Sequence, residues 1–495
     1  MSRIMSRVIT NFSAKKTAFP YQAQAFETIK DLNYSAIFHE QGLGKTKIAI
    51  DLLLYWLQKK DIDTVLIVTK KQLIKNWQDE FSIHTHISPK VLSNKRSDNF
   101  YVFNSAAKVI ITNFETLSSE KERMILFLKA RNVAIIIDES AKLKNPDAKL
   151  TKVFFELSPL FKIKTIMTGT PVANRPYDIW AQIFFLDAGK SLGEDFDSFR
   201  KDADLTNDLA HDDISRDVFE STVASIFDKI SSFSVRETKK SCAIALPKKI
   251  YETVYCDFEE NQRIIYNTVL HELEVEVKQN GRMVLDDDTV ALKRLLRLNQ
   301  IASNPALIDD NYTNIPGKMT KLRRLIEEIV SKGDKCIVWS SFIENIDYFT
   351  KMFSNYCPRK IHGKMAIEER NKSVDVFKKE DKCKILFATP QAAKEGLTLT
   401  VANHVIFYDR GFNLDDYLQA QDRIHRISQK KTCYVYNLMI SDSIDEWIDC
   451  LITAKHYAAL LTQGDISSEE CSQYADYKYG DLIKEILASG EEKNE

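Results

Sequence analysis

The chain lacks the features that mark membrane-spanning, exported and disulfide-rich proteins. It contains no run of about 18 apolar residues, so no helix that crosses a bilayer is predicted. The N-terminal segment MSRIMSRVITNFSAKK has no apolar stretch of signal-peptide length. The eight cysteines include no pair with C-x-x-C spacing, which disfavours a zinc ribbon or a redox motif. We therefore expect free thiols and a cytosolic protein, or a nuclear one if the source is eukaryotic.

The sequence also lacks an excess of charge of either sign. Lys and Arg total 69 and Asp and Glu total 70, so the formal net charge is −1. No global field attracts the chain to polyanions, and any nucleic-acid site would need its basic groups gathered on one face. The 495 residues, of which 44% are hydrophobic and 28% charged, predict an ordinary globular protein with about two to four domains.

Short apolar runs without polar alternation recur along the chain, as is typical of strands buried on both faces of a parallel sheet. The first half contains five of them: Ala36–Phe38, Val65–Thr69, Val109–Thr112, Val133–Ile137 and Thr165–Met167. Helical patterns alternate with them, including Thr46–Gln58 and Gln72–Phe81. Strand-like runs return at Lys335–Trp339, Cys383–Ala388, His404–Tyr408 and Cys433–Leu438. The pattern predicts two doubly wound α/β lobes.

Four regions are predicted from these patterns. Residues 1–16 form an N-terminal tail, and 17–248 form the first lobe with a helical insert at about 187–245. Residues 249–464 form the second lobe with a helical insert at about 258–315, and 465–495 form an acidic tail.

The segment Ser35–Lys47 (SAIFHEQGLGKTK) predicts a phosphate-binding loop. An apolar strand runs into Gly42-Leu43-Gly44-Lys45-Thr46, and a helical pattern begins at once. Such a loop turns backbone N–H groups toward anionic oxygens, and the helix N-terminus adds its positive dipole end. Lys45 is expected to reach the β- and γ-phosphates of ATP and Thr46 to hold Mg²⁺. A glycine turn that binds nothing is the alternative, and His39 stands where a glycine is common.

A second apolar strand delivers Asp138 and Glu139 to the end of the sheet where open α/β folds bind ligands. Asp138 is the candidate Mg²⁺ ligand. Glu139 is the candidate base that orients and deprotonates the attacking water. An acidic pair at the surface is the alternative interpretation of these two residues.

With these residues placed, the chain resembles helicase superfamily two, and within it the compact bacterial or viral Swi/Snf-like ATP-dependent DNA translocases. About a dozen collinear segments together carry the resemblance. They include FPYQ (Phe19–Gln22), HEQGLGKT (His39–Thr46), VLIVTKKQLIKNWQDEF (Val65–Phe81), DESAKLKN (Asp138–Asn145), MTGTPVANRPYDIW (Met167–Trp180), VRETKK (Val235–Lys240), KIHGKMAIEER (Lys360–Arg370) and QAQDRIHRISQ (Gln419–Gln429). It implies two tandem RecA-like parallel-sheet lobes with helical insertions and a cleft between the lobes. It also implies a DNA-stimulated ATP hydrolase, with ATP and Mg²⁺ as its cofactors.

The resemblance assigns further roles to residues of this chain. Gln22 is expected to read the adenine, while Gln41, Gly42, Leu43, Gly44, Lys45, Thr46 and Gly396 surround the nucleotide. Arg426 is expected to be the arginine finger, and Arg423 to bridge to the γ-phosphate or to a nearby carboxylate. The acidic box reads D-E-S-A, so Ser140 and Ala141 cannot supply the histidine contact usual in the family.

Polar residues at strand ends are candidates for binding nucleic-acid phosphates without reading bases. They are Thr69, Lys71, Thr112, Asn113, Ser340, Ser341 and Thr389, with capping of strand ends as the alternative role. The expected partner is double-stranded or branched DNA, bound independently of sequence. The protein is expected in the cytoplasm, in association with the nucleoid. Trp77 is expected to pack in the core beneath these candidate nucleic-acid contacts.

Three functions remain open at this point. The first is translocation on double-stranded DNA with remodelling of protein–DNA complexes or branched DNA. The second is strand separation by a DNA or RNA helicase. The third belongs to another class, a nucleic-acid-binding scaffold without turnover, which the D-E-S-A box motivates.

Overall fold

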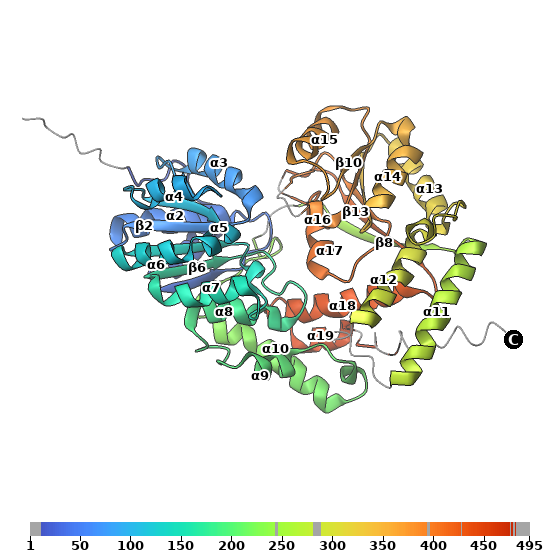
Figure 1. The fold of residues 1–495 in the computed structure, drawn as a ribbon, viewed down its shortest axis with the longest axis horizontal. Coiled ribbons are helices and arrows are strands. Elements are labelled where there is room, and N and C mark those ends of the chain that lie inside the picture. The colour runs from blue at the N-terminus through green and yellow to red at the C-terminus, as the bar shows by residue number, and fades with distance from the viewer. Residues whose placement is uncertain are drawn as a thin grey trace, which may run out of the picture. The chain divides into compact units, whose positions relative to one another are not determined.

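The computed structural model describes residues 11–242, 246–280, 289–393, 397–426, 428–475, 477–478 and 481. The chain divides into two compact units (Figure 1). Unit 1 contains Met1–Asp204, Val218–Ile244 and Ala459–Ser468. Unit 2 contains Leu205–Asp217, Ala245–Ala458 and Glu469–Glu495. The segment Ala459–Ser468 thus belongs to unit 1, although in sequence it directly follows Ala458 of unit 2.

The sheet of unit 1 is parallel throughout its described strands, in the order β3-β4-β2-β5-β6-β1-β7. Its strands are β1 (Tyr34–Ile37), β2 (Thr64–Thr69), β3 (Lys90–Val91), β4 (Val109–Asn113), β5 (Val133–Asp138), β6 (Ile163–Met167) and β7 (Ser234–Val235). Every residue of β2, β4 and β5 is buried, as their unbroken apolar patterns predict. The parallel direction brings the carboxyl ends of β1, β2, β5 and β6 to one edge of the sheet.

Unit 1 contains most of the helices of the first half of the chain. They are α1 (Pro20–Ile29), α2 (Lys45–Lys59), α3 (Ile74–His84), α4 (Arg96–Phe103), α5 (Phe114–Ser119), α6 (Lys121–Ala130), α7 (Lys149–Leu157), α8 (Trp180–Asp187), α9 (Phe196–Ala203) and α10 (Asp213–Ile230), whose first residues belong to unit 2. Apolar side chains of α1, α2 and α3 form one core with alternate residues of the strands. Aromatic rings of α5, α7 and α8 contact one another elsewhere in the unit, through Phe114, Phe154 and Phe185.

The sheet of unit 2 is also parallel throughout its described strands, in the order β10-β11-β9-β12-β13-β8. Its strands are β8 (Lys249–Cys256), β9 (Cys336–Trp339), β10 (Arg359–Ile361), β11 (Ile385–Ala388), β12 (His404–Phe407) and β13 (Cys433–Ile440). Its helices are α11 (Glu260–Asn280), α12 (Thr289–Ser303), α13 (Gly317–Ser331), α14 (Ile343–Met352), α15 (Ile367–Lys379), α16 (Pro390–Ala393), α17 (Leu414–Gln421), α18 (Ile444–Thr462) and α19 (Ser468–Tyr474). Two parallel sheets with helices confirm the predicted α/β fold class.

None of the described helices is long and apolar enough to cross a membrane. All eight cysteines are free thiols, as their spacing predicts.

Candidate active site

Two glycines shape the loop between β1 and α2. Gly42 has a φ of +90° and Gly44 a φ of +69°, in the left-handed region that glycine adopts without strain. Gly44 is also the N-cap of α2, so the loop leads directly into a helix N-terminus. A Cβ atom on Gly44 would lie 2.4 Å from Nε2 of Gln22, so the Gln22 side chain would have to move to accommodate it. The backbone therefore has the form that the predicted phosphate loop requires.

Lys45 begins α2, and its Nζ donates to the carbonyl oxygens of His39 at 2.9 Å and Glu40 at 3.4 Å. Loss of contact with water lowers the pKa of Lys45 to about 8, and the nearby carboxylates of Glu139 and Asp138 oppose that shift. The ammonium group of Lys45 therefore has neutral carbonyl groups as its hydrogen-bond partners. Its charge is poorly solvated, and a bound anion would compensate for this. A phosphate group fits this environment.

Gln22 lies against the loop rather than apart from it. Its Nε2 donates to the carbonyl oxygen of Leu43 at 3.1 Å, and its Oε1 accepts from the backbone N–H of Phe19 at 2.9 Å. On the other side of the loop, a Cβ atom on Gly169 would lie 2.5 Å from Cγ of Gln41 and 3.2 Å from Nζ of Lys45. Gln22 and Gln41 therefore flank the phosphate loop, while their roles toward a nucleotide stay predictions.

Asp138 is the last residue of β5 and is buried. Its Oδ2 accepts hydrogen bonds from the hydroxyl of Thr69 at 3.0 Å and from the indole N–H of Trp77 at 2.8 Å. Burial, with the neighbouring charge of Glu139 second, raises the pKa of Asp138, and the two donors oppose this effect. Within the described residues, no protein group donates to the other carboxylate oxygen, Oδ1.

The donor set fits Mg²⁺ bound together with a phosphate. The described residues contain no group of three or more His, Cys, Asp and Glu that could hold a metal by itself. Mg²⁺ needs no such group, since it is commonly held by one or two protein oxygens and the phosphates of the substrate. The hydroxyl of Thr46, in the first turn of α2, and Oδ1 of Asp138 are the two protein oxygens that would hold it.

Glu139 adopts a left-handed backbone conformation, with φ 58° and ψ 48°. A non-glycine residue in this region is strained, and such strain is concentrated at functional sites. Its Oε2 lies 3.5 Å from Nζ of Lys70, the residue that follows β2. Lys70 was not among the predicted site residues, because nothing in the sequence shows that the end of β2 lies beside the end of β5.

Ser140 of the acidic box forms a hydrogen bond with Gln182, which lies in α8. Its hydroxyl donates to Oε1 of Gln182 at 2.8 Å, and Nε2 of Gln182 donates to the carbonyl oxygen of Pro171 at 2.7 Å. Both Ser140 and Gln182 are fully buried. Gln182 of α8 therefore bridges the D-E-S-A box and Pro171 of the MTGTPVANRPYDIW segment.

Arg236, in the VRETKK segment after β7, contacts the strand that leads into the phosphate loop. Its Nη1 donates to the carbonyl oxygen of Phe38 at 2.6 Å, and its Nε donates to Oδ1 of Asp465 at 2.8 Å. Asp465 belongs to the segment Ala459–Ser468. The Arg236–Asp465 ion pair is thus one contact of that segment with unit 1.

His39 is fully buried beside the phosphate loop, and neither ring nitrogen has a hydrogen-bond partner among the described residues. Burial, helped by the charges of Lys45 and Arg236, lowers its pKa to about 4. The folded protein therefore holds a neutral imidazole, whereas the unfolded chain takes up a proton near pH 6.5. The stability that this provides is present above pH 6.5 and is lost as the pH falls from 6.5 toward 4.

We expect the free energy of unfolding of wild-type protein to fall by about 3 kcal/mol more than that of His39→Phe across this window. Phenylalanine fills the same space and does not titrate. Urea unfolding at several pH values gives the dependence of the free energy of unfolding on pH for both proteins. His86→Phe, which changes an exposed histidine, is the control variant. The same dependence on pH for the wild type and His39→Phe would show that His39 does not titrate as described.

The candidate arginines lie in unit 2, after α17. Nη1 of Arg426 donates to the hydroxyl of Thr398 at 2.7 Å, and its Nε donates to the carbonyl oxygen of Asp422 at 3.2 Å. Burial lowers the pKa of Arg426, and the charge of Asp422 opposes this shift. Arg423 is buried and donates to the carbonyl oxygen of Leu397 and to Oε1 of Gln419, each at 3.4 Å. The predicted residue Gly396 lies outside the described residues.

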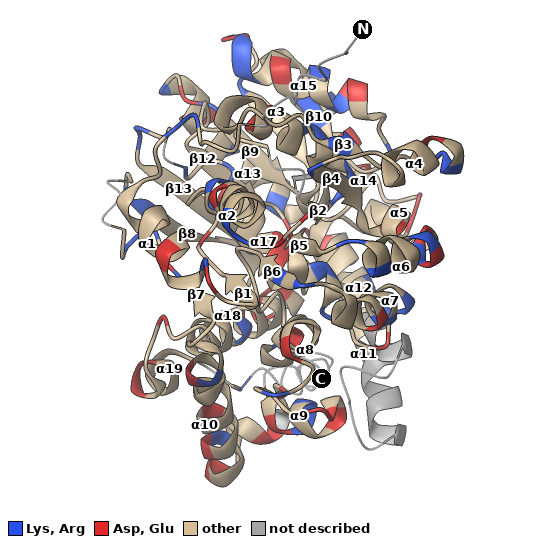
Figure 2. Ribbon diagram, turned by 90° about the vertical axis from the view of Figure 1, so that its left-hand side faces the viewer, with Lys and Arg blue, Asp and Glu red and all other residues tan. Residues whose placement is uncertain are grey.

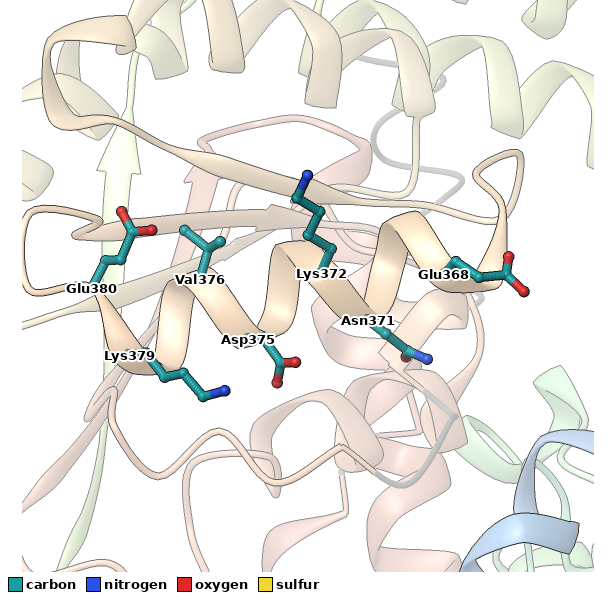
Figure 3. A pocket seen from close by; sticks show the side chains of 7 residues that line it. All are labelled: Glu368, Asn371, Lys372, Asp375, Val376, Lys379 and Glu380. Carbon is teal, nitrogen blue, oxygen red and sulfur yellow. The ribbon is translucent and has the colours of Figure 1, made fainter.

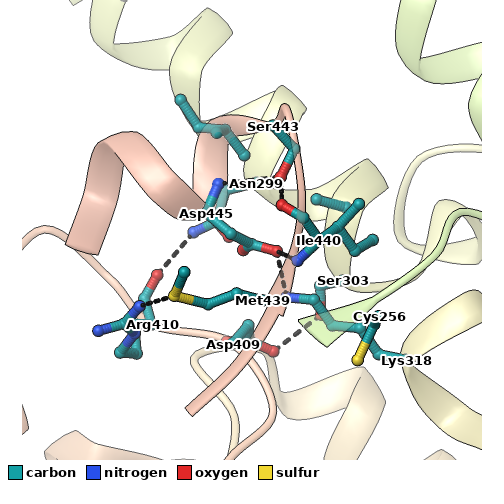
Figure 4. A network of polar contacts seen from close by, with 12 residues as sticks. Cys256, Asn299, Ser303, Lys318, Asp409, Arg410, Met439, Ile440, Ser443 and Asp445 are labelled. Carbon is teal, nitrogen blue, oxygen red and sulfur yellow. Dashed lines mark hydrogen bonds and ion pairs between the residues drawn. The ribbon is translucent and has the colours of Figure 1, made fainter. Parts of the chain in front are cut away.

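A buried polar network fixes the segment that leads into α17 (Figure 4). Lys318 and Asp445 form an ion pair at 2.7 Å, and Nζ of Lys318 also donates to the carbonyl oxygen of Tyr408 at 3.1 Å. Asp409, the next residue, accepts from the hydroxyls of Ser303 at 2.8 Å and Ser340 at 2.5 Å. The network holds the end of β12 and so the start of the connection toward the arginines.

Two models of protein families match the chain and together cover most of it. A model described as SNF2-related domain matches residues 29–307, and one described as helicase conserved C-terminal domain matches residues 317–428. The chain belongs to the SNF2 family. Membership confirms the resemblance and the enzyme class, an ATP hydrolase, that the motifs predict.

Several relatives of this SNF2 chain have names that refer to DNA or chromatin. The chromatin-remodeling complex ATPase ISW2 of Saccharomyces cerevisiae is 27% identical over 86% of this chain and 39% of its own length. The DNA repair and recombination protein RAD54-like of Danio rerio is 24% identical over 90% of this chain and 66% of its own length. The chain spans between about two fifths and one half of the length of the first curated relatives that it matches.

Among solved structures, the Sulfolobus solfataricus SWI2/SNF2 ATPase core in complex with dsDNA is 25% identical to this SNF2 chain, with a TM-score of 0.42. The match covers 94% of this chain and 98% of the other.

The structure places the predicted nucleic-acid contacts in two classes. The side chains of Thr69, Thr112 and Ser340 are fully buried, and their hydroxyls donate to Asp138, to the carbonyl oxygen of Asn113 and to Asp409. The side chain of Asn113 caps α5, and Thr389 is also buried. Lys71 and Ser341 are exposed. Of these seven residues, Lys71 and Ser341 are therefore the ones whose side chains a phosphate could reach without rearrangement.

Charged residues of both signs lie on the helices α10 and α15 of the SNF2 chain. Figure 2 shows basic and acidic residues interspersed along α10 and α15. A groove of about 570 Å³ lies along α15, lined by Glu368, Asn371, Lys372, Asp375, Val376, Lys379 and Glu380 (Figure 3). Its mixed charges are those of a solvated surface, and it contains none of the predicted site residues.

Proposed function

We propose that the chain hydrolyses Mg²⁺-ATP and uses the energy to translocate on double-stranded DNA, where it remodels protein–DNA complexes or branched DNA. The observation that carries the proposal is the convergence, at one edge of the unit 1 sheet, of the phosphate loop, Lys45 and the two carboxylates of the acidic box. SNF2 family membership and DNA-directed relatives support the choice of DNA as the track.

In the proposed cycle, the loop amides and Lys45 bind the phosphates, and Glu139 orients the attacking water and accepts its proton. Thr46 and Asp138 would hold Mg²⁺, which neutralises charge that develops on the phosphate oxygens. Arg426 supplies a guanidinium to the γ-phosphate, so hydrolysis needs the two units to close on one ATP. DNA bound by both units favours closure, and opening after hydrolysis moves one unit along the track.

The test is ATP hydrolysis by the wild type and by Lys45→Ala with double-stranded, single-stranded and branched DNA and with RNA. We expect stimulation by double-stranded DNA, a steep loss of stimulation with added salt, and no stimulated hydrolysis by Lys45→Ala. Equal hydrolysis by the two proteins would favour the scaffold function. Robust unwinding of plain duplex, with or without a 3′ tail, would favour the strand-separating helicase.

A further inference from the structure

We propose that Trp77 and Thr69 are positioning residues for Asp138, which hold one of its carboxylate oxygens so that the other faces the metal ion of the ATP site. This inference rests on the proposed function and adds two residues that the sequence did not connect with ATP. The two residues were expected in other roles, Thr69 as a phosphate contact and Trp77 as core packing.

The arrangement of strands brings Thr69 to Asp138. Strands β2 and β5 are neighbours, and Val68 pairs with Ile137 in their register. The next residue of each strand is Thr69 and Asp138, so their side chains meet at the carboxyl end of the sheet. The 3.0 Å hydrogen bond from the Thr69 hydroxyl to Oδ2 follows from this register.

Trp77 reaches the same oxygen from the next helix. It lies in α3, is 1% exposed, and packs against Phe81 with a distance of 6.2 Å between ring centroids. Packing fixes the ring, and the ring aims its single N–H at Oδ2 over 2.8 Å. An indole nitrogen can only donate, so this bond is specific for an acceptor oxygen.

Two donors on one oxygen orient the whole carboxylate. A hydrogen bond to a charged group is stronger than one between neutral groups, and outer contacts of this kind set the direction of a metal ligand. Oδ1 has no donor among the described residues and is left as the oxygen that a cation can bind. Loss of one donor should therefore weaken metal binding while the other donor still satisfies Oδ2.

The test uses Trp77→Phe and Thr69→Val in the full chain, with a fluorescent, non-hydrolysable ATP analogue and titrated Mg²⁺. We expect each variant to need roughly tenfold more Mg²⁺ for half-maximal enhancement of analogue binding. Binding of the analogue in EDTA should be unchanged, and hydrolysis of ATP should recover at high Mg²⁺. A loss of fold alone would not produce recovery by the metal.

The matched control is Trp56→Phe. Trp56 is also fully buried in unit 1 and donates its indole N–H, to the carbonyl oxygen of Lys30 at 3.2 Å, away from the carboxylates. Its Mg²⁺ requirement should equal that of the wild type. A requirement for Trp77→Phe and Thr69→Val equal to that of Trp56→Phe would overturn the inference.

Asp138→Asn separates failure of this inference from failure of the proposed function. If Mg²⁺ enhances analogue binding by the wild type and Asp138→Asn abolishes the effect, the proposed metal site stands and the two donor variants decide the inference. If Mg²⁺ does not enhance binding by the wild type, both the metal site and the inference fail.

Discussion

Replacement of Glu139 by Gln is expected to leave ATP binding intact and to slow hydrolysis by about 10²- to 10⁴-fold, the contribution of a general base. Glutamine keeps the size of the side chain and the strained backbone at φ 58°, but it cannot accept a proton. The ion pair with Lys70 at 3.5 Å would be lost, and both groups are partly exposed, so little stability depends on it. Single-turnover hydrolysis and analogue binding measure the two effects separately.

Glu115→Gln is the matched control for this variant. Glu115 lies in α5 of the same unit, is largely exposed and contacts Lys142 at 3.8 Å. It should hydrolyse ATP as fast as the wild type. Near-normal turnover by Glu139→Gln would exclude Glu139 as the base and would leave the role to another residue near the phosphate loop.

Replacement of Arg426 by Ala is expected to lower DNA-stimulated hydrolysis by about 10³- to 10⁵-fold, the effect of an arginine finger. This is equivalent to roughly 4–7 kcal/mol of transition-state stabilisation. Binding of ATP should change little, because the phosphate loop and Lys45 belong to unit 1. Arg426→Lys should restore only part of the rate, since an ammonium cannot make the two parallel contacts of a guanidinium.

Most of the fold could be predicted from the sequence, because central strands of a parallel sheet are apolar on both faces. The predicted runs Val65–Thr69 and Val133–Ile137 agree with the bounds of β2 and β5 to within one residue at each end. Edge strands carry no such signal. The strand β8 mixes apolar, aromatic and polar residues without an unbroken apolar run, and it is buried only at its last residue. The strands β3, β7 and β10 are only two or three residues long.

The positions of the site residues could be predicted less well than their identities. Lys45 could be identified because its glycine loop stands between an apolar run and a helical pattern, and Asp138 and Glu139 because they end an apolar run. The contacts of Lys70, Trp77 and Arg236 depend instead on which strands lie side by side, and the sequence shows this order only after the sheet is known. The hydroxyls of Thr69 and Ser340 illustrate the same limit, since each donates to a buried carboxylate.

The most direct measurement is the rate of ATP hydrolysis by Arg426→Ala as double-stranded DNA is titrated. We expect that ATP still binds, that DNA still binds, and that the stimulation of hydrolysis is almost abolished. Arg324→Ala, which removes an exposed arginine of unit 2, should be stimulated like the wild type. A stimulation ratio for Arg426→Ala equal to that of the wild type would contradict a shared ATP site completed by unit 2.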